Sequence, residues 1–379
     1  MKRLCAIFLI LCCLTGCGKK AAAPDYTPAY TSSTLAPPED TPVFQYLYGN
    51  GRTVLGVVIG NYEAETTFYL LEAQGENLSV TKQFSLDTLR WRVCLGLDDQ
   101  DGIWVQGQDN AGAAHIQRFS LSGELLLDID LGAEYPQWAV YGFSWDDEHY
   151  DFLVQGYHDA WLIQFDLEGQ EVFRRSLNDY CSDTAGYLDR EEDWMEELEG
   201  REGDRLLEML YPDGPINHMN LFRFPDGSVG MMIRRQSPID SEAYNILCTL
   251  EDGGKKAVPQ ISYELEEEHS VQLCGFFESE DPKYDLLITQ FSGLYGLSLQ
   301  NGTMELLISW SDAKCNVVDL SGNTKPTKAD RGPNGELWFY EYDGIYDRCV
   351  VTRLTPATQT SAPVSGADVF YLQPAFSLA

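Results

Sequence analysis

Positive charge and histidine are scarce in this sequence. Its 379 residues include 26 Lys and Arg against 59 Asp and Glu, with 5 His, and the formal net charge is −33. A surface of this sign repels nucleic acid and anionic lipid surfaces. Nucleic acid is therefore excluded as a partner, whereas cationic or metal-bridged partners remain open. The simplest interpretation of the acidity is solubility.

The sequence also lacks the short motifs of common enzyme sites. It has no His-Glu-x-x-His, no Gly-x-Ser-x-Gly, no phosphate-binding Walker loop and no dinucleotide-binding glycine fingerprint. The stretch from Asp98 to Gly102 is similar to a calcium loop, but Ile103 stands where such loops require Gly, so we expect a turn. The sequence predicts no catalytic residue, no metal ligand and no cofactor, and enzymatic activity is disfavoured.

Long apolar runs are absent except at the start. Leu4 to Leu14 form an apolar run of 11 residues behind Lys2 and Arg3. A membrane-spanning helix needs about 20 apolar residues, so neither this run nor any later segment is expected to cross a bilayer. A basic start, a short apolar run and small residues together indicate a secretory signal at residues 1–16.

The apolar run ends in Leu14-Thr15-Gly16-Cys17, which resembles the lipobox of bacterial lipoproteins. The resemblance implies cleavage before Cys17 and a diacylglyceryl thioether on its sulfur, with palmitate among the acyl chains. It implies a lipid-anchored protein on the outer side of the cell membrane, extracellular or periplasmic. Loss of Lys2 and Arg3 with the signal takes the net charge from −33 to −35. The alternative is an ordinary cleaved signal in which Cys17 has no role.

Closely paired cysteines are missing as well. No Cys-x-x-Cys occurs, which disfavours a zinc site. Beyond the N-terminal region six cysteines remain, widely spaced: Cys94, Cys181, Cys248, Cys274, Cys315 and Cys349. Their even number permits disulfides in an exported protein. Most of them lie in apolar strand-like runs, however, which favours buried thiols.

Residues 18–41 contain few large apolar side chains. They run from Gly-Lys-Lys-Ala-Ala-Ala-Pro into a Thr, Ser, Pro and Ala mixture that includes Pro37 and Pro38. This composition predicts a flexible tether from Cys17 to residue 41. As a coil it would span roughly 25–30 Å, and as an extended polyproline-like chain up to about 75 Å.

What the rest of the chain has is a repeat. Phe119-Ser-Leu121-Ser-Gly123 matches Phe165-Asp-Leu167-Glu-Gly169, and looser copies end in glycines at 75, 253 and 302. These glycines are 48, 46, 84 and 49 residues apart, and the longest interval contains an acidic stretch of 37 residues, 179–215. Removing that stretch leaves 47. A period of this length is typical of β-propeller blades.

Within each unit the apolar residues alternate as in strands. Leu125, Leu127 and Ile129 alternate with Leu126, Asp128 and Asp130. A turn rich in Asp and Gly precedes the second strand of a unit. We therefore expect each unit to contain four strands, joined in order by that turn, a short loop and a Gly hairpin. Four such strands bury both faces only when units stack around a ring.

We therefore predict an all-β fold, a propeller of six four-stranded blades, with seven as the alternative. The expected units are 43–87, 91–132, 138–178, 218–265, 270–312 and 314–373, and Val369 to Leu372 is the expected outer strand of the last. The chain resembles the six-bladed propellers of the NHL-like, TolB-like and lactonase-like groups. The resemblance lies in the strand pattern and in the length of the repeat. The propeller domain is predicted at 42–379, after the signal at 1–16 and the tether at 17–41.

The stretch 179–215 stands apart from the repeat. From Asp189 to Glu208 it has ten acidic residues and three arginines. Apolar stripes around Trp194 and Leu206 predict two short helices separated by glycines. A solvated insertion is the simpler interpretation, and a docking element or lid is the alternative.

Candidate binding residues come from the expected inner strands. Lactonase-like propellers hold a divalent metal with Glu, Asp and Asn, whereas only His218 and Asn220 offer ligands on the inner strands here. Trp138, Tyr141 and Trp145 lie on the first strand of the third unit, where they could stack on a sugar or peptide. Trp104 and Trp338 occupy equivalent second-strand positions, which predicts packing between blades.

Two functions follow as hypotheses. The first is a membrane-anchored module, a monomer, that binds or scaffolds a protein, peptide or glycan and could assist solute uptake. The second is a propeller hydrolase or lyase outside the cytoplasm, with a divalent metal or a carboxylate pair at the central funnel. The second needs two carboxylates facing one pocket.

Overall fold

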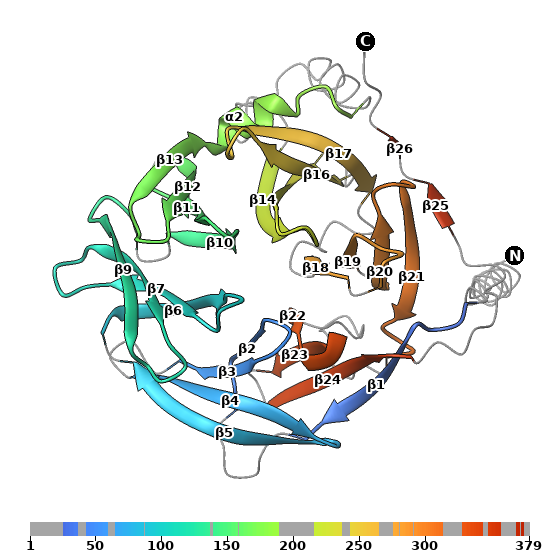
Figure 1. The fold of residues 1–379 in the computed structure, drawn as a ribbon, viewed down its shortest axis with the longest axis horizontal. Helices are drawn as coiled ribbons and strands as arrows, with labels where there is room; N and C mark the ends of the chain where they lie inside the picture. Colours follow the sequence, from blue (N-terminus) through green and yellow to red (C-terminus); the bar gives the residue numbers. More distant parts are fainter. Residues whose placement is uncertain are drawn as a thin grey trace, which may run out of the picture.

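Six antiparallel sheets stand around a common centre in the computed structural model of this chain (Figure 1). The structure describes residues 26–36, 43–59, 65–86, 88–136, 139–157, 159–188, 216–236, 243–264, 276–279, 281–290, 292–313, 328–343, 348–357, 369–371 and 373–374. The prediction of an all-β propeller with six four-stranded blades is confirmed.

Each of blades one to five is built from four consecutive strands, which run from the centre of the ring outward (Figure 1). Blade one contains β2 (Tyr46–Gly49), β3 (Val54–Val58), β4 (Thr66–Gln74) and β5 (Asn77–Leu86). Blade two contains β6 (Arg90–Leu97), β7 (Ile103–Gln108), β8 (Ala114–Phe119) and β9 (Leu125–Gly132), and blade three contains β10 (Val140–Trp145), β11 (His149–Gln155), β12 (Ala160–Asp166) and β13 (Glu171–Ser176). Blade four contains β14 (Ile216–Arg223), β15 (Val229–Gln236), β16 (Ala243–Glu251) and β17 (Lys256–Glu264), and blade five contains β18 (Phe276–Glu278), β19 (Leu286–Thr289), β20 (Gly293–Ser298) and β21 (Thr303–Ser309).

Blade six is assembled from both ends of the described chain. Its inner strands are β22 (Lys328–Arg331), β23 (Leu337–Asp343) and β24 (Arg348–Pro356), and its outer strand is β1 (Tyr30–Leu35), which pairs with β24 along its whole length. The short helical turn η2 (Pro333–Gly335) joins β22 to β23. The ring is therefore closed by an N-terminal strand.

Two sequence-based expectations are wrong at this closure. The outer strand of blade six is not Val369 to Leu372: β25 (Val369–Tyr371) pairs with β21 of blade five, and β26 (Gln373–Pro374) pairs with β17 of blade four. The expected tether is also too long, because Tyr30–Leu35 belong to the propeller. An open edge of β24 would leave backbone groups unpaired, and the β-branched Thr residues of β1 suit a strand.

Large side chains fill the spaces between neighbouring blades. Trp104 is fully buried and contacts Phe143, Tyr150 and Phe152 of blade three, with ring centroids 5.3, 4.6 and 5.4 Å away. Trp338 is buried in the equivalent position, in a cluster that includes apolar residues of blade one. The prediction that both tryptophans pack between blades is confirmed.

Polar side chains fasten one blade to the backbone of the next. The Gln106 side chain of blade two accepts from Val140 N and donates to Val140 O of blade three, both at 2.8 Å. Tyr48 of blade one donates to Cys94 O of blade two at 2.6 Å. Tyr340 of blade six donates to Phe44 O beside blade one. These bonds fix the angle between blades as well as their separation.

The described start of the acidic insertion is a short helix that was not expected from the sequence. Helix α2 (Leu177–Asp183) follows β13 directly, with Ser176 as its N-cap. The two predicted helices fall within 189–215, which lies outside the described residues. No helix in the described ranges is long and apolar enough to cross a membrane.

Among the cysteines whose burial the structure describes, Cys94 and Cys248 are buried in the core. Cys94 lies in the cluster between blades one and two, and Cys248 in the cluster between blades three and four. Cys248 is a free thiol, and burial raises its pKa to about 12. The expectation of buried thiols is confirmed for Cys248. Cys274 and Cys315 lie outside the described residues.

Candidate functional site

The turns between the first and second strands of the blades are shaped by aspartate side chains. Asp98 accepts from the N–H groups of Gln100 and Gly102, at 2.9 and 2.7 Å. Asp146 accepts from Glu148 and His149 N–H groups in the same way, at 2.8 and 2.7 Å. These bonds make side chain-stabilised turns. The expectation that Asp98 to Gly102 is a turn is confirmed.

The Asp98 carboxylate also organises two neighbouring strands. Its Oδ2 accepts from Trp104 Nε1 at 2.8 Å and from Arg118 Nε at 2.6 Å, and Trp104 and Arg118 lie opposite each other in the ladder. Gly102 is required here, because a Cβ on it would lie 2.4 Å from Asp98 Oδ2. Asp98 is thus a structural residue, with its carboxylate occupied by donors.

Blade six repeats this arrangement with a longer acid. Glu336 Oε2 accepts from Trp338 Nε1 at 2.9 Å, and Arg353, opposite Trp338 in the ladder, lies 3.8 Å from Glu336. The sequence analysis noted both tryptophans but missed the acid and the arginine. The detectable signal was an acid shortly before each Trp and an Arg 14 or 15 residues after it.

Beside these structural turns lies a cluster that we call the inner-turn cluster. It consists of five charged side chains and one indole: Arg52, Asp99, Asp101, Asp147, Arg223 and Trp145. Arg223, at the end of the innermost strand of blade four, joins three blades. Its Nη1 lies 3.1 Å from Asp99 of blade two and its Nη2 lies 3.8 Å from Asp147 of blade three. Its Nε donates to Gly227 O at 3.2 Å, which fixes the guanidinium.

Arg52 and Asp101 connect blade one to blade two in the same cluster. Arg52 Nη2 lies 3.5 Å from Asp101 Oδ2 and also donates to Asp99 O. Asp101 Oδ1 accepts from Asn50 Nδ2 at 2.8 Å and from Thr53 Oγ1 at 2.9 Å. Asp101 is held by these donors, whereas the side chains of Asp147 and Asp99 are 96% and 44% exposed.

Trp145 supplies the aromatic surface of the inner-turn cluster. Its ring stacks on Phe143 at 5.1 Å, and the Arg223 guanidinium lies 5.6 Å from its centroid. An arginine at this distance from an indole is attracted by the ring quadrupole. The cluster therefore combines exposed carboxylates with a partly exposed indole whose position is fixed.

The structure separates the aromatic residues that the sequence grouped together. Tyr141 is 46% exposed near the start of β10, and Trp145 is at its end, which places their Cα atoms about 13 Å apart along the strand. Trp138 lies outside the described residues. Of the two that are described, it is Trp145 that contacts Arg223.

His218 and Asn220 lie on β14, the innermost strand of blade four. His218 is opposite Arg234 in the ladder, and its side chain is outside the described part. Asn220 is half-buried, and its Oδ1 accepts from Leu221 N at 2.9 Å. Within the described ranges, no group of three His, Cys, Asp or Glu side chains is arranged to hold a metal ion.

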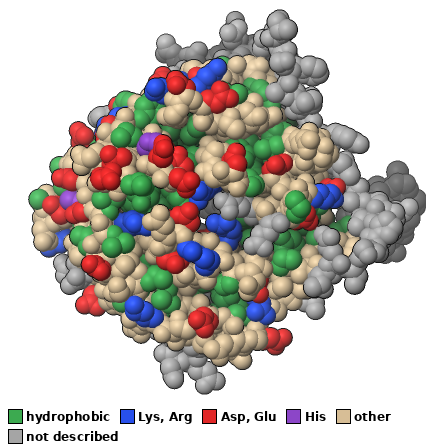
Figure 2. Space-filling view, in the orientation of Figure 1, with side chains coloured by type: hydrophobic (Ala, Val, Ile, Leu, Met, Phe, Trp, Pro, Cys, Tyr) green, Lys and Arg blue, Asp and Glu red, His purple; other side chains and the backbone are tan. Residues whose placement is uncertain are grey.

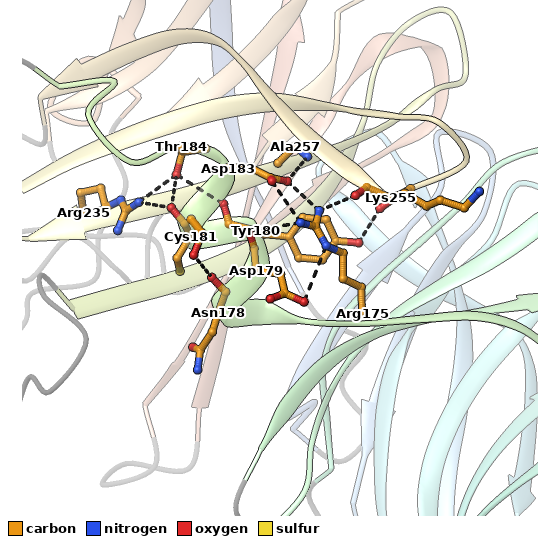
Figure 3. Close-up of polar contacts among 12 residues, drawn as sticks. Arg175, Asn178, Asp179, Tyr180, Cys181, Asp183, Thr184, Arg235, Lys255 and Ala257 are labelled. Atoms are coloured by element: carbon orange, nitrogen blue, oxygen red, sulfur yellow. Dashed lines mark hydrogen bonds and ion pairs between the residues drawn. The ribbon is translucent and has the colours of Figure 1, made fainter.

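A second polar cluster surrounds α2, which lies between the outer strand of blade three and β17 of blade four (Figures 1 and 3). Arg175 donates to both carboxylate oxygens of Asp183, at 2.6 and 3.0 Å, and its guanidinium lies 4.4 Å from the Tyr180 ring centroid. Asp183 also accepts from Ala257 N at 2.9 Å. Burial opposes ionisation of Asp183, but the bonds from Arg175 and Ala257 hold its pKa below the ordinary value.

The other contacts of α2 show that this cluster is a clamp between blades. Tyr180 donates to Gly254 O at 2.5 Å, and Arg235 of β15 donates to Cys181 O and to Thr184 Oγ1 at 2.5 and 2.9 Å (Figure 3). Leu177 and Tyr180 are buried in the apolar cluster between the two blades. We interpret the α2 cluster as structural.

Asp151 of β11 is a buried carboxyl group whose described hydrogen bond lies outside both clusters. It is 1% exposed, and its Oδ1 accepts from Gln164 Nε2 at 3.1 Å. Its Oδ2 has no hydrogen-bond partner among the described residues. Burial raises the pKa of Asp151 to about 7. The group is therefore expected to change charge near neutral pH.

Comparisons with known proteins assign no family to this chain. No protein-family model matches it, and no curated protein matches it. Among the solved structures that resemble it, a protein of unknown function from Bacteroides caccae is 8% identical over 68% of each chain, with a TM-score of 0.33. A protein from Lactobacillus plantarum is 11% identical over 88% of this chain and 86% of that chain, with a TM-score of 0.33. A candidate 6-phosphogluconolactonase from Bacteroides uniformis is 12% identical over 80% of this chain and 82% of that chain, with a TM-score of 0.35. Similarity at this level assigns no activity.

Proposed function

We propose that this chain is a membrane-anchored lipoprotein outside the cytoplasm, and that its propeller is a binding or scaffold module for a protein or peptide. The lipobox-like sequence ending in Cys17 supports the anchor. The inner-turn cluster supports the binding role, because it places the exposed carboxylates of Asp99 and Asp147 beside the Trp145 indole.

The state of the carboxylates favours binding over acid–base catalysis. Asp99 is paired with Arg223, and Asp101 is held by Asn50, Thr53 and Arg52. A general acid or base must form a hydrogen bond to the reacting group of the substrate, whereas these two carboxylates are already bonded to donors of the protein. The exposed oxygens suit the cationic side chain of a Lys- or Arg-containing peptide, whose alkyl stem would lie on the indole.

A peptide and glycan array probed with the Cys17→Ala protein tests the binding role. We expect retention on basic peptides, and we expect Asp147→Asn to weaken it about tenfold, as loss of one charge-assisted contact would. Asp252→Asn is the matched control, because the Asp252 side chain is also exposed, at 77%, on a hairpin of blade four. Retention on glycans only, or equal loss in both variants, would contradict the peptide assignment.

Mass spectrometry of the membrane-bound protein tests the anchor. We expect a mature N-terminus at Cys17 carrying acyl chains. The Cys17→Ala variant should move to the soluble fraction, because two acyl chains are needed for stable attachment. An unmodified N-terminus at another residue would contradict the proposed anchor.

A further inference from the structure

The N-terminal segment of the described chain is fixed at the boundary between blades five and six. Tyr26 donates to Asp312 Oδ2 at 2.5 Å and accepts from Ser309 N at 2.7 Å. Ala29 N donates to Leu307 O of blade five, and Ala357 N, just beyond β24 of blade six, donates to Ala29 O, both at 2.8 Å. The chain therefore enters the ring at its outer edge, at a defined place.

The covalent distance from Cys17 to that place is short. Eight residues, 18–25, separate Cys17 from Tyr26. A chain of that length reaches at most about 30 Å when fully extended. As a coil its mean span is roughly 15–18 Å. A lipid on Cys17 would thus hold the edge near Tyr26 close to the bilayer, with much less freedom than the 24-residue tether expected from the sequence.

The two outermost strands of blade six carry no acidic side chain. β1 has no charged side chain, and β24 has two Arg and no acid, in a chain whose net charge is −33. Thr31 and Thr34 of β1 are exposed, and Arg353 of β24 donates to Ser33 Oγ at 3.2 Å. Lipid headgroups that carry negative charge would repel the acidic surfaces but not this edge.

We propose that the outer edge of blade six, formed by β1 and β24, faces the lipid headgroups, so that the ring is held by its edge and blade three is farthest from the membrane. This inference rests on the proposed lipidation of Cys17. β13 of blade three lies on the opposite side of the ring from β1 (Figure 1). The inner-turn cluster would then open to solution beside the membrane rather than against it.

Energy transfer from two positions on the full lipidated protein tests the orientation. A donor dye is attached through an encoded azido residue at Thr34 or at Val172, which is 49% exposed on β13. The vesicles contain phosphatidylcholine and phosphatidylglycerol with an acceptor on the headgroups. Because the tether reaches only about 30 Å, we expect transfer from position 34 to exceed that from position 172 by roughly threefold or more.

A longer tether provides the matched control. Insertion of about 20 Gly and Ser residues between Asp25 and Tyr26 gives a coil that spans roughly 30 Å on average, so the difference between the two positions should shrink. Equal transfer from both positions in the lipidated parent protein would overturn the orientation while leaving the anchor intact. An N-terminus without lipid, seen by mass spectrometry, would instead overturn the anchor and this inference with it.

Discussion

At the scale of single residues, a few buried polar groups determine how blades two and three are built. Asp98 holds a turn, an indole and a guanidinium with one carboxylate. Trp104, whose indole donates to Asp98, also packs against blade three. Asp151, by contrast, is a buried carboxyl with one described donor. The first two residues stabilise the fold, whereas the third makes it sensitive to pH.

Removal of the Trp104 side chain is expected to be costly. Trp104→Ala should lower the free energy of unfolding by about 3–5 kcal/mol, because it leaves a cavity against three aromatic rings and removes a donor from Asp98. Trp104→Phe keeps most of the contact and should cost clearly less. Urea unfolding followed by circular dichroism measures both. A Trp104→Ala protein within about 1 kcal/mol of the parent would contradict this account of the blade contact.

Asp151 is expected to make stability depend on pH in an unusual direction. Burial raises the pKa of Asp151 to about 7 in the folded chain, above its ordinary value of 3.8. The folded state therefore binds more protons between these values, and stability falls as pH rises from about 4 to 7. Asp151→Asn should remove this contribution and raise stability at pH 8, by on the order of 4 kcal/mol.

Thermal unfolding of the parent and of Asp151→Asn at a series of pH values measures this effect. Glu124→Gln is the control, because Glu124 is exposed on a hairpin of blade two and should leave the pH profile unchanged. If the difference between the parent and Asp151→Asn is the same at pH 5 and pH 8, the carboxyl does not titrate as described.

At the scale of elements, β1 and α2 fasten neighbouring parts of the ring in different ways. β1 completes blade six and continues into Ala36, whose N–H donates to Glu76 O of blade one and whose O accepts from Leu78 N, both at 2.8 Å. Leu35 of β1 is fully buried in the cluster between blades six and one. α2 instead fills the space between blades three and four.

Loss of β1 is expected to open the ring. A chain beginning at residue 37 should lose about 3 kcal/mol or more relative to one beginning at residue 26, since the burial of Leu35 and a whole strand ladder disappear. It should also aggregate, because the edge of β24 becomes exposed. Urea unfolding and light scattering measure the two effects, and a synthetic 26–36 peptide should restore stability by pairing with β24. Equal stability of the two chains would show that β1 does not close the ring.

At the scale of the whole molecule, the ring presents several different surfaces to its surroundings. Acidic side chains are spread over the face in Figure 2, with Lys and Arg side chains among them near the centre. The outer edge of blade six is free of acidic side chains on its two strands. If that edge faces the membrane, the charged face seen in Figure 2 is left for partners in solution.

The sequence by itself determined the features that depend on neighbours along the chain. Alternating apolar residues, Asp and Gly turns and a repeat of 46–49 residues were enough to predict four-stranded units and a six-bladed ring. The reason is physical: a hairpin is specified by its own turn and by the residues that face the same side, all within one repeat. The tryptophans could be assigned to packing between blades because they occupy equivalent positions in two repeats.

Only the tertiary structure decided which distant residues meet. Arg223 contacts Asp99, 124 residues earlier in the chain, because blades four and two both reach the centre of the ring. β1 pairs with β24 although Tyr30 and Pro356 lie far apart in the sequence, because closure of the ring brings the N-terminal strand beside blade six. Ser- and Thr-rich composition gave β1 the appearance of a tether, and no local pattern reveals a strand whose partner is supplied by closure of the ring.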